Sequence, residues 1–287
     1  MKLIQQIALS YYSIKIRSIS FFSPTKGAEK AFDLFCTPMN GRMKRQKPSI
    51  FNQATLTTFS INNLSINGWH WLPENKQLPI KTILIVHGFD SSSYRFEKYI
   101  PYFLQAGYQV YAFDGPAHGV SEGKYINSLL YKEMILKAAK EFGPFHGIMA
   151  HSLGALATSL AVDEDANITN KLVLIAPATE SVRALQRFAH FLKLSPRISK
   201  SIDDYVVKIA NQPLSWFSVN RTVSSIKKPI LWLHDKKDDI CPFEDIQPSL
   251  QKQLPNVEFY ITEGLGHSKI YRDKHSIEKI TSFLTQE

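Results

Sequence analysis

The chain has 287 residues, of which 44% are hydrophobic and 21% are charged, and it contains two cysteines, Cys36 and Cys241. These values are typical of a globular α/β domain with an insertion, and they exclude a disulfide-stapled framework and a cysteine-rich metal site. The formal net charge is +9. Residues 1–50 hold nine Lys/Arg against two Asp/Glu, so the rest of the chain is nearly neutral and the charge does not indicate a nucleic-acid partner.

The first 50 residues form a basic segment that we expect to be largely helical. Ile4, Ile7, Tyr11, Ile14 and Arg17/Ser18 recur there at helical spacing, which predicts an amphipathic helix. The stretch is too polar for a membrane span and lacks the pattern of a secretory signal. Either this stripe packs on the domain, or the helix lies on a membrane surface, helped by the basic run at 41–47. We therefore expect a cytoplasmic protein, peripheral to the membrane under the second interpretation.

From residue 54, strand-like and helix-like segments alternate. Alternating stretches at 54–61 and 64–72 predict two paired strands. Continuous apolar runs predict buried strands at 81–89, 108–116, 145–151, 171–178, 228–235 and 256–264. Helical patterns lie between them, at 93–107, 125–143, 153–162, 243–253 and the C-terminus. This order predicts right-handed crossovers and a mostly parallel central sheet flanked by helices.

Residues 179–222 interrupt this order, because they carry no strand pattern. Two apolar helix faces are expected there, one before and one after Pro196. The predicted organisation is a basic segment at 1–50, a core in two parts at 51–178 and 223–287, and a helical insertion at 179–222. The apolar residues of the insertion, Trp216 and Phe217 among them, either hold it on the core or line a substrate pocket.

A serine, a carboxylate and a histidine follow three of the predicted strands. Ligands bind beyond the carboxyl ends of parallel strands. Ser152 follows 145–151, Asp235, Asp238 and Asp239 follow or end 228–235, and His267 follows the last strand. A serine hydroxyl needs a histidine to take its proton, and the histidine needs a carboxylate to orient it. Small residues beside Ser152, at Ala150 and Gly154, suit the sharp turn that exposes such a hydroxyl.

Five motifs in chain order resemble those of the α/β-hydrolase superfamily, in its serine esterase and monoglyceride-lipase-like branch. They are His87-Gly88, the turn Asp114-Gly115-Pro116-Ala117-His118-Gly119-Val120-Ser121, the elbow Ala150-His151-Ser152-Leu153-Gly154, the acid segment His234 to Pro242, and Gly266-His267. Ala150 and Ala117 stand where the family has Gly, Asp235 where it has Gly, and Cys241 where it has Val. The resemblance covers about residues 55–287.

The resemblance implies an α/β-hydrolase fold with a helical cap and residue roles within it. Ser152 is the expected nucleophile, His267 the base and Asp238 the acid, favoured over Asp235 and Asp239 by the family spacing. The expected oxyanion donors are the backbone N–H groups of Phe89 and Leu153, with His87 and Gly88 supporting their loop. The same resemblance makes Asp114 and His118 structural residues of the loop after the second buried strand.

The expected function is hydrolysis of a small carboxylic ester through an acyl-enzyme on Ser152, without cofactor or metal. Thioesterase, peptidase, acyltransferase and carbon–carbon bond hydrolase activities use the same three groups and remain alternatives. So does a ligand-binding member of the fold without catalysis. The acyl and leaving groups and the oligomeric state are not predicted.

Overall fold

The computed structural model describes residues 3–38, 46–74 and 80–286, and for 3–9 only the backbone. The chain forms two compact units. The sheet unit comprises Pro38–Thr179 and Val219–Glu287, and the helical unit comprises Met1–Thr37 and Glu180–Ser218. The N-terminal segment and the insertion, which the sequence analysis treats separately, thus belong to one unit.

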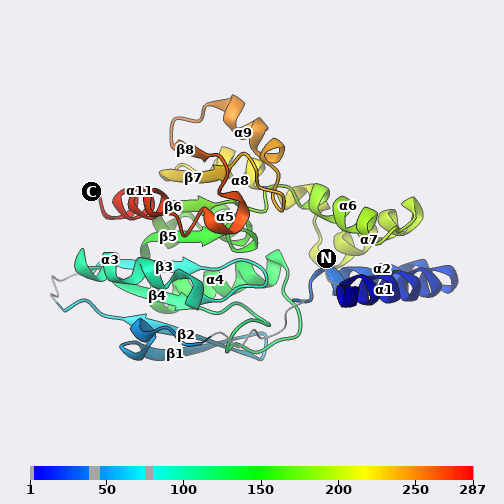
Figure 1. Ribbon diagram of the computed structural model, residues 1–287, viewed down its shortest axis with the longest axis horizontal. Helices are drawn as coiled ribbons and strands as arrows, with labels where there is room; N and C mark the ends of the chain where they lie inside the picture. The colour runs from blue at the N-terminus through cyan, green and yellow to red at the C-terminus, as the bar shows by residue number, and fades with distance from the viewer. Residues whose placement is uncertain (1–2, 39–45, 75–79, 287) are drawn as a thin grey trace. The chain divides into compact units, whose positions relative to one another are not determined.

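The sheet unit is built on eight strands in the order β1-β2-β4-β3-β5-β6-β7-β8 (Figure 1). Their bounds are β1 Thr55–Ile61, β2 Leu64–Trp71, β3 Thr82–Val86, β4 Gln109–Phe113, β5 Phe145–His151, β6 Thr169–Ile175, β7 Ile230–Asp235 and β8 Val257–Thr262. The pairs β1–β2 and β2–β4 are antiparallel, and every pair from β4 to β8 is parallel. The predicted mostly parallel sheet is therefore confirmed.

The burial of the strands follows their sequence patterns. Every residue of β3 and β7 is buried, as expected of continuous apolar runs between two helical layers. β1 lies at the edge and buries only Phe59 and Ile61. The indole N–H of Trp71, in β2, donates a hydrogen bond to the Ile50 carbonyl over 2.9 Å. This bond holds the short 3-10 turn Ser49–Asn52 against the sheet.

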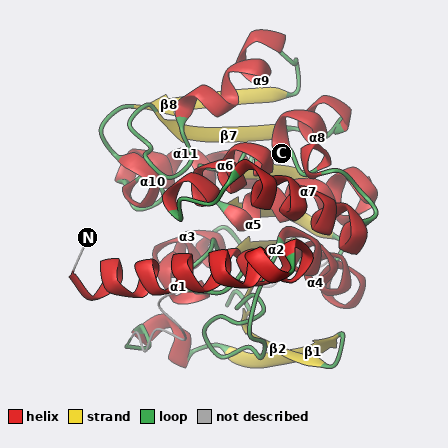
Figure 2. Cartoon of the chain, turned by 90° about the vertical axis from the view of Figure 1, so that its right-hand side faces the viewer, coloured by secondary structure: helices red, strands yellow, loops and turns green. Residues whose placement is uncertain are grey.

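Helices cover both faces of this sheet. Their bounds are α3 Ile100–Gln105, α4 Ser128–Phe142, α5 Leu153–Glu164, α8 Val219–Ser225, α9 Gln247–Lys252, α10 Gly266–Lys269 and α11 Lys274–Thr285. α4 packs on α5 and α5 on α8, whereas α11 packs on α3 (Figure 2). The predicted helix over 93–107 is instead a 3-10 segment, Ser93–Tyr99, followed by α3 with Pro101 in its first turn.

The helical unit contains α1 Leu3–Phe22, α2 Pro24–Phe35, α6 Ser181–Phe191 and α7 Pro196–Ala210. The basic segment forms two helices because Ser23 caps α2, its side chain accepting from the Lys26 N–H, and Pro24 opens it. α2 packs on α1 and on α7. In the part of the chain that the structure describes, no helix combines the length and apolarity needed to cross a bilayer.

The apolar stripe predicted on α1 is not the side that packs. Tyr11 and Ile14 are exposed, whereas Ile16 and Ser20 are buried. Sequence spacing identifies an apolar stripe but not the surface that covers it. Ser20 faces α2, where Gly27 allows a close approach of the two helices. The side chains of Ile4 and Ile7 lie outside the described residues.

Candidate active site

Ser152 stands at the junction of β5 and α5 in a strained conformation. Its φ is +55° and its ψ is −121°, in a region that non-glycine residues rarely occupy. The turn is held from both sides: the Ser152 N–H donates to the Ile175 carbonyl over 3.0 Å, and the Ala178 N–H donates to the Ser152 carbonyl over 3.1 Å. These bonds to β6 and the segment after it hold the strained turn in place.

Small residues around Ser152 are required by close contacts. A Cβ on Gly154 would lie 2.2 Å from the His87 carbonyl oxygen, and a Cβ on Gly88 would lie 2.8 Å from the Ser152 Cβ. The loop after β3 therefore lies directly against the turn. Ala150, where the resembled motif has a glycine, is fully buried, so its methyl group is accommodated in the core.

Gly154→Ala is expected to lower the free energy of unfolding by about 1–3 kcal/mol, because the new methyl group must displace the backbone of residue 87. At an unobstructed helical position the same substitution stabilises a protein by up to about 1 kcal/mol, so the sign of the effect is diagnostic. Urea denaturation of both proteins measures the difference. Equal or higher stability of the variant would contradict the close contact.

The structure brings Ser152, His267 and Asp238 together in a hydrogen-bonded chain. His267 Nε2 lies 3.0 Å from Ser152 Oγ, and His267 Nδ1 lies 2.8 Å from Asp238 Oδ2. With its proton on Nδ1, the imidazole donates to the carboxylate and accepts from the serine hydroxyl. The Asp238 side chain is fully buried and that of His267 is 12% exposed. This arrangement can move a proton from the serine to the imidazole and stabilise the resulting charge.

The loop after β7 orients the Asp238 carboxylate. Its Oδ1 accepts hydrogen bonds from the N–H groups of Ile240 and Cys241, at 2.9 and 2.8 Å, which leaves Oδ2 for His267. His234 lies 3.9 Å from the same carboxylate, but its Nε2 donates to the Cys241 carbonyl over 2.7 Å. Burial lowers the pKa of His234, so it stays neutral beside the charged aspartate.

Asp235 fastens the loop that carries His267. Its carboxylate accepts hydrogen bonds from the Thr262 hydroxyl, at 2.7 Å, and from the N–H groups of Leu265 and Lys237, both at 2.9 Å. Burial opposes ionisation of Asp235, but these donors outweigh it and lower its pKa to about 2. From the sequence, Asp235 is a rival to Asp238; its place in the position of a family glycine is the available signal of a separate role.

His151 lies beside Ser152, and the sequence alone indicates no role for its side chain. Its Nε2 donates to the backbone carbonyl of His267 over 3.0 Å, and the two rings lie 4.7 Å apart. Among the described residues, its buried Nδ1 has no hydrogen-bond partner. Burial first, and then the neighbouring His267, lowers the pKa of His151 far below its ordinary value. A neutral His151 thus ties the elbow to the loop of His267.

Neutral histidines also organise the loops after β3 and β4. His87 Nδ1 donates to the Gly88 carbonyl over 2.7 Å and its Nε2 accepts from the Gly115 N–H over 2.8 Å. His118 donates from Nδ1 to the Pro116 carbonyl, and its Nε2 accepts from the Asp90 N–H over 3.0 Å. Each ring nitrogen therefore has one partner. Phe89, an expected oxyanion donor, lies in the loop that these rings hold.

Asp114 has a comparable role beneath the β4 loop. Its Oδ1 accepts from the Ser93 N–H and hydroxyl, both at 2.8 Å, and its Oδ2 accepts from the Val120 N–H at 3.0 Å. A Cβ on Gly119, whose φ is +48°, would lie 1.7 Å from this carboxylate. All three hydrogen bonds to the Asp114 carboxylate are structural, and none involves Ser152.

The chain is expected to lose stability between pH 7 and pH 5 because of these histidines. Burial lowers the pKa values of His87 and His118 from 6.5 to about 4. The unfolded chain therefore binds more protons in this window, so the free energy of unfolding falls as the pH falls, by about 2–4 kcal/mol in total. Urea denaturation at constant ionic strength measures the loss.

The matched variants for this measurement are His118→Asn and His275→Gln. His275 is on the surface of α11, with its side chain 78% exposed. His118→Asn is expected to flatten the pH dependence and His275→Gln to leave it unchanged. Equal slopes for all three proteins would contradict the role of buried neutral histidines.

Two other groups of the sheet unit are not part of the hydrogen-bonded chain Ser152–His267–Asp238. Asp239 is exposed and His275 pairs with Glu278 on α11. In the helical unit, Glu180 accepts a hydrogen bond from the Ser218 hydroxyl over 2.7 Å, and Trp216 packs edge-on against the buried Phe217. Within the described ranges 3–38, 46–74 and 80–286, no group of three His, Cys, Asp or Glu side chains could hold a metal ion.

Leu153 and Phe89, the predicted oxyanion donors, both lie in segments next to the turn at Ser152. Leu153 is the first residue of α5, where helix N–H groups have no partner within the helix. Phe89 follows Gly88, whose missing side chain brings the β3 loop against Ser152. The positive end of the α5 dipole points at the same spot.

Comparisons with known proteins agree with this architecture. Residues 77–216 match the family model described as serine aminopeptidase, S33. The uncharacterized protein YqkD of Bacillus subtilis is 25% identical over 245 residues, covering 80% of this chain and 79% of its own. The monoglyceride lipase homolog of Monkeypox virus is 22% identical over 265 residues, covering 79% of this chain and 94% of its own.

Solved structures share the fold. The Pyrococcus furiosus esterase Pf2001 superimposes with a TM-score of 0.64 at 22% identity, covering 87% of this chain and 97% of its own. Est1E of Butyrivibrio proteoclasticus, solved with ferulic acid bound, has a TM-score of 0.63 at 21% identity and covers 80% and 96%. The eight-stranded sheet and these matches show the α/β-hydrolase fold. The chain therefore has the α/β-hydrolase fold, and its sequence is similar to that of a monoglyceride lipase homolog.

Proposed function

We propose that the chain is a serine hydrolase that cleaves a carboxylic ester through an acyl-enzyme on Ser152. The observation that carries this proposal is the continuous hydrogen-bonded chain Ser152–His267–Asp238, with heavy-atom distances of 3.0 and 2.8 Å. Each residue comes from the end of a different strand, and no packing requirement needs all three. Two solved structures of similar fold support a small acyl substrate: the esterase Pf2001, and Est1E with its bound ferulic acid.

Acylation begins when Ser152 Oγ attacks the ester carbonyl. His267 Nε2 takes the hydroxyl proton, and Asp238 stabilises the imidazolium through the bond to Nδ1. The tetrahedral intermediate collapses when His267 returns this proton to the leaving alcohol. Ser152 then carries the acyl group as an ester.

Deacylation repeats these steps with water. His267 takes a proton from the water, whose oxygen attacks the acyl-Ser152 carbonyl, and then protonates Ser152 Oγ as the carboxylic acid leaves. The N–H groups of Leu153 and Phe89 bind the oxyanion in both halves of the cycle. One such donor is typically worth about 2.7–4 kcal/mol of transition-state stabilisation.

A fluorophosphonate probe tests this proposal directly. Attack by Ser152 displaces fluoride and leaves a stable phosphonyl-serine, which peptide mass spectrometry locates. The folded wild-type protein is expected to be labelled at Ser152, Ser152→Ala not at all, and His267→Ala only slowly. Thermal unfolding of each protein shows that the variants are folded. Absence of labelling in the folded wild type, or labelling elsewhere, would overturn the assignment and leave a ligand-binding member of the fold.

The bond that is cleaved is tested with matched substrates. A series of p-nitrophenyl esters, a thioester and an anilide with the same acyl group compares ester, thioester and amide hydrolysis. The largest kcat/KM is expected for an ester. A thioester preference of more than about tenfold, equivalent to 1.4 kcal/mol in the transition state, would replace the esterase proposal by a thioesterase.

His151 is expected to position His267 in this reaction. His151→Leu removes the donor to the His267 carbonyl, so kcat is expected to fall by about 10–100-fold with a much smaller change in KM. His151→Gln can place an amide N–H near the former Nε2 and should restore most of the rate. If both variants lose activity equally, bulk packing rather than the hydrogen bond explains the effect.

A further inference from the structure

One face of α1 in the helical unit exposes a continuous group of aromatic, aliphatic and cationic side chains. Its residues lie three, four or one apart, which places them along one side of a helix. Phe21 and Phe22 are each 85% exposed, Ile14 is 64% exposed and Tyr11 is 58% exposed. We call this surface the α1 face; it comprises Tyr11, Ile14, Lys15, Ser18, Phe21 and Phe22.

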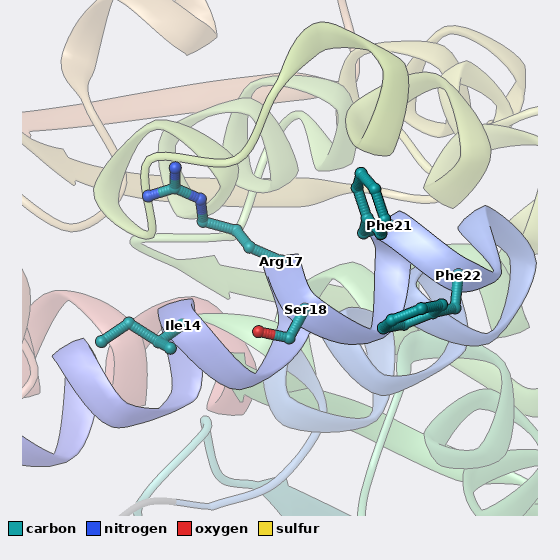
Figure 3. Close-up of a pocket in the computed structure, with 5 residues that line it drawn as sticks. All are labelled: Ile14, Arg17, Ser18, Phe21 and Phe22. Carbon is teal, nitrogen blue, oxygen red and sulfur yellow. The ribbon is translucent and has the colours of Figure 1, made fainter.

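An open hollow runs beside the end of the α1 face. It is lined by Ile14, Arg17, Ser18, Phe21 and Phe22 (Figure 3). Single exposed apolar residues are normal on protein surfaces, but a contiguous group of this kind marks an interaction site. Phe21 and Phe22 also pack against each other edge-to-face, with ring centroids 5.3 Å apart, so they are presented as one apolar group.

The opposite side of α1 is held within the helical unit. Ile16 and Ser20 are buried, and Ser20 meets Gly27 of α2, where a Cβ would lie 1.9 Å from the Ser20 hydroxyl oxygen. The Ser13 hydroxyl donates to the carbonyl of Leu192, beyond the end of α6. These contacts fix the rotation of α1 about its axis. The α1 face is therefore directed outward by packing on its other side.

α2 is in turn held by the insertion. Phe32 packs edge-to-face on Tyr205 of α7, with ring centroids 5.9 Å apart, and Phe35 packs on Phe188 of α6 at 5.1 Å. The apolar residues that could have covered the α1 face are thus used inside the unit. The side chains of the α1 face are left exposed.

The positive charge of the helical unit favours an anionic partner for the α1 face. Met1–Thr37 and Glu180–Ser218 hold eleven Lys/Arg against five Asp/Glu, so this unit carries +6 of the formal +9. Within the α1 face, Lys15 Nζ lies 5.7 Å from the Tyr11 ring centroid, and Arg17 lines the adjacent hollow. Aromatic side chains interleaved with cations suit the interface of an anionic bilayer, where rings enter the headgroup layer and cations meet phosphates.

A second copy of the chain is a poorer occupant. A two-fold dimer through the α1 face would bring the same patch of both copies together. Lys15 and Arg17 of one copy would then approach those of the other, which like-charge repulsion opposes.

We propose that the α1 face docks the protein on an anionic lipid surface, with Phe21 and Phe22 inserted and Lys15 and Arg17 contacting lipid phosphates. This inference concerns where the protein binds and does not depend on the proposed hydrolysis, because docking requires no turnover.

Vesicle co-sedimentation of the full chain tests this proposal. Vesicles of equal phosphatidylcholine and phosphatidylglycerol are compared with vesicles of phosphatidylcholine alone. Phe21→Ser/Phe22→Ser is expected to weaken binding to the anionic vesicles at least about tenfold. Lys15→Gln and Arg17→Gln are each expected to weaken it about fivefold, and added salt should weaken the wild type.

The matched control is Leu56→Ser/Leu72→Ser, which removes two other exposed apolar side chains from the sheet unit. It is expected to bind like the wild type. Thermal unfolding and ester hydrolysis are measured on every variant. Failure of the wild type to bind anionic vesicles, or equal binding by Phe21→Ser/Phe22→Ser, overturns the docking proposal while intact hydrolysis leaves the proposed function standing.

Sedimentation velocity tests whether a second copy of the chain, rather than a lipid surface, covers the α1 face. A concentration-dependent dimer that Phe21→Ser/Phe22→Ser dissolves, together with no vesicle binding, assigns the α1 face to a second copy and overturns lipid docking. Equal binding to neutral and anionic vesicles overturns the electrostatic part of the proposal, because the cations would then contribute nothing.

Discussion

Ser152→Ala, His267→Ala and the double variant are expected to lose kcat by nearly the same amount, about 10⁴- to 10⁶-fold. The reason is that Ser152 Oγ and His267 Nε2, 3.0 Å apart, form one proton-transfer unit. Without the imidazole the hydroxyl is a poor nucleophile, and without the hydroxyl the imidazole has no proton to take. Single-turnover kinetics on a p-nitrophenyl ester, with active-site titration of the wild type, measure all three losses.

Non-additivity is the decisive feature of this set. If the two residues acted independently, the losses of the single variants would multiply in the double variant. Ser224→Ala is the control: its hydroxyl donates to the Asn220 carbonyl within α8 and lies outside the Ser152–His267–Asp238 chain. It is expected to keep wild-type activity. A double variant far below either single variant would show that another base serves Ser152.

Asp238→Asn is expected to lower kcat by about 10⁴-fold while leaving the fold intact. An amide at position 238 can donate to His267 Nδ1 and so hold the proton on Nε2, which faces Ser152 and must be free to accept. It also removes the charge that stabilises the imidazolium. Steady-state kinetics and the pH dependence of kcat/KM measure the effect.

Asp239→Asn is the matched control, because Asp239 is the next residue but is exposed. It is expected to retain wild-type kcat within about twofold, as surface substitutions away from the reacting groups usually do. A large loss in Asp239→Asn with little loss in Asp238→Asn would exchange the roles of the two carboxylates. Asp235→Asn would act differently. Because Asp235 accepts hydrogen bonds from the loop of residues 262–265, this substitution is expected to lower the free energy of unfolding.

Local patterns were sufficient for the order and type of most elements. Continuous apolar runs predict the buried strands β3 and β7 because both faces of a parallel sheet are covered. The predicted Ser, Asp and His lie at strand ends that a parallel sheet brings to one edge, where two hydrogen bonds join them. The sharp turn at Ser152 follows from Gly154, whose place no larger residue can take without displacing residue 87.

Other features depend on distances between segments that sequence spacing does not encode. His151 is next to Ser152 in the chain, but its bond joins it to a carbonyl 116 residues away. Asp235 is hydrogen-bonded to a loop 27 to 30 residues further on. Both side chains gain their partners only when β7, β8 and the elbow meet at one edge of the sheet.

The amino-acid sequence by itself determined the mostly parallel sheet, and it singled out the candidate residues Ser152, Asp238 and His267. Periodicity and turn chemistry depend on only a few neighbouring residues, and this short range was enough to predict the strands and the residues that follow them. The tertiary structure alone decided that residues 1–37 join the insertion in one unit and that Tyr11 and Ile14 face outward. Periodicity reports that a helix has an apolar stripe, but only the packing of its other side on a neighbouring helix decides whether that stripe is covered.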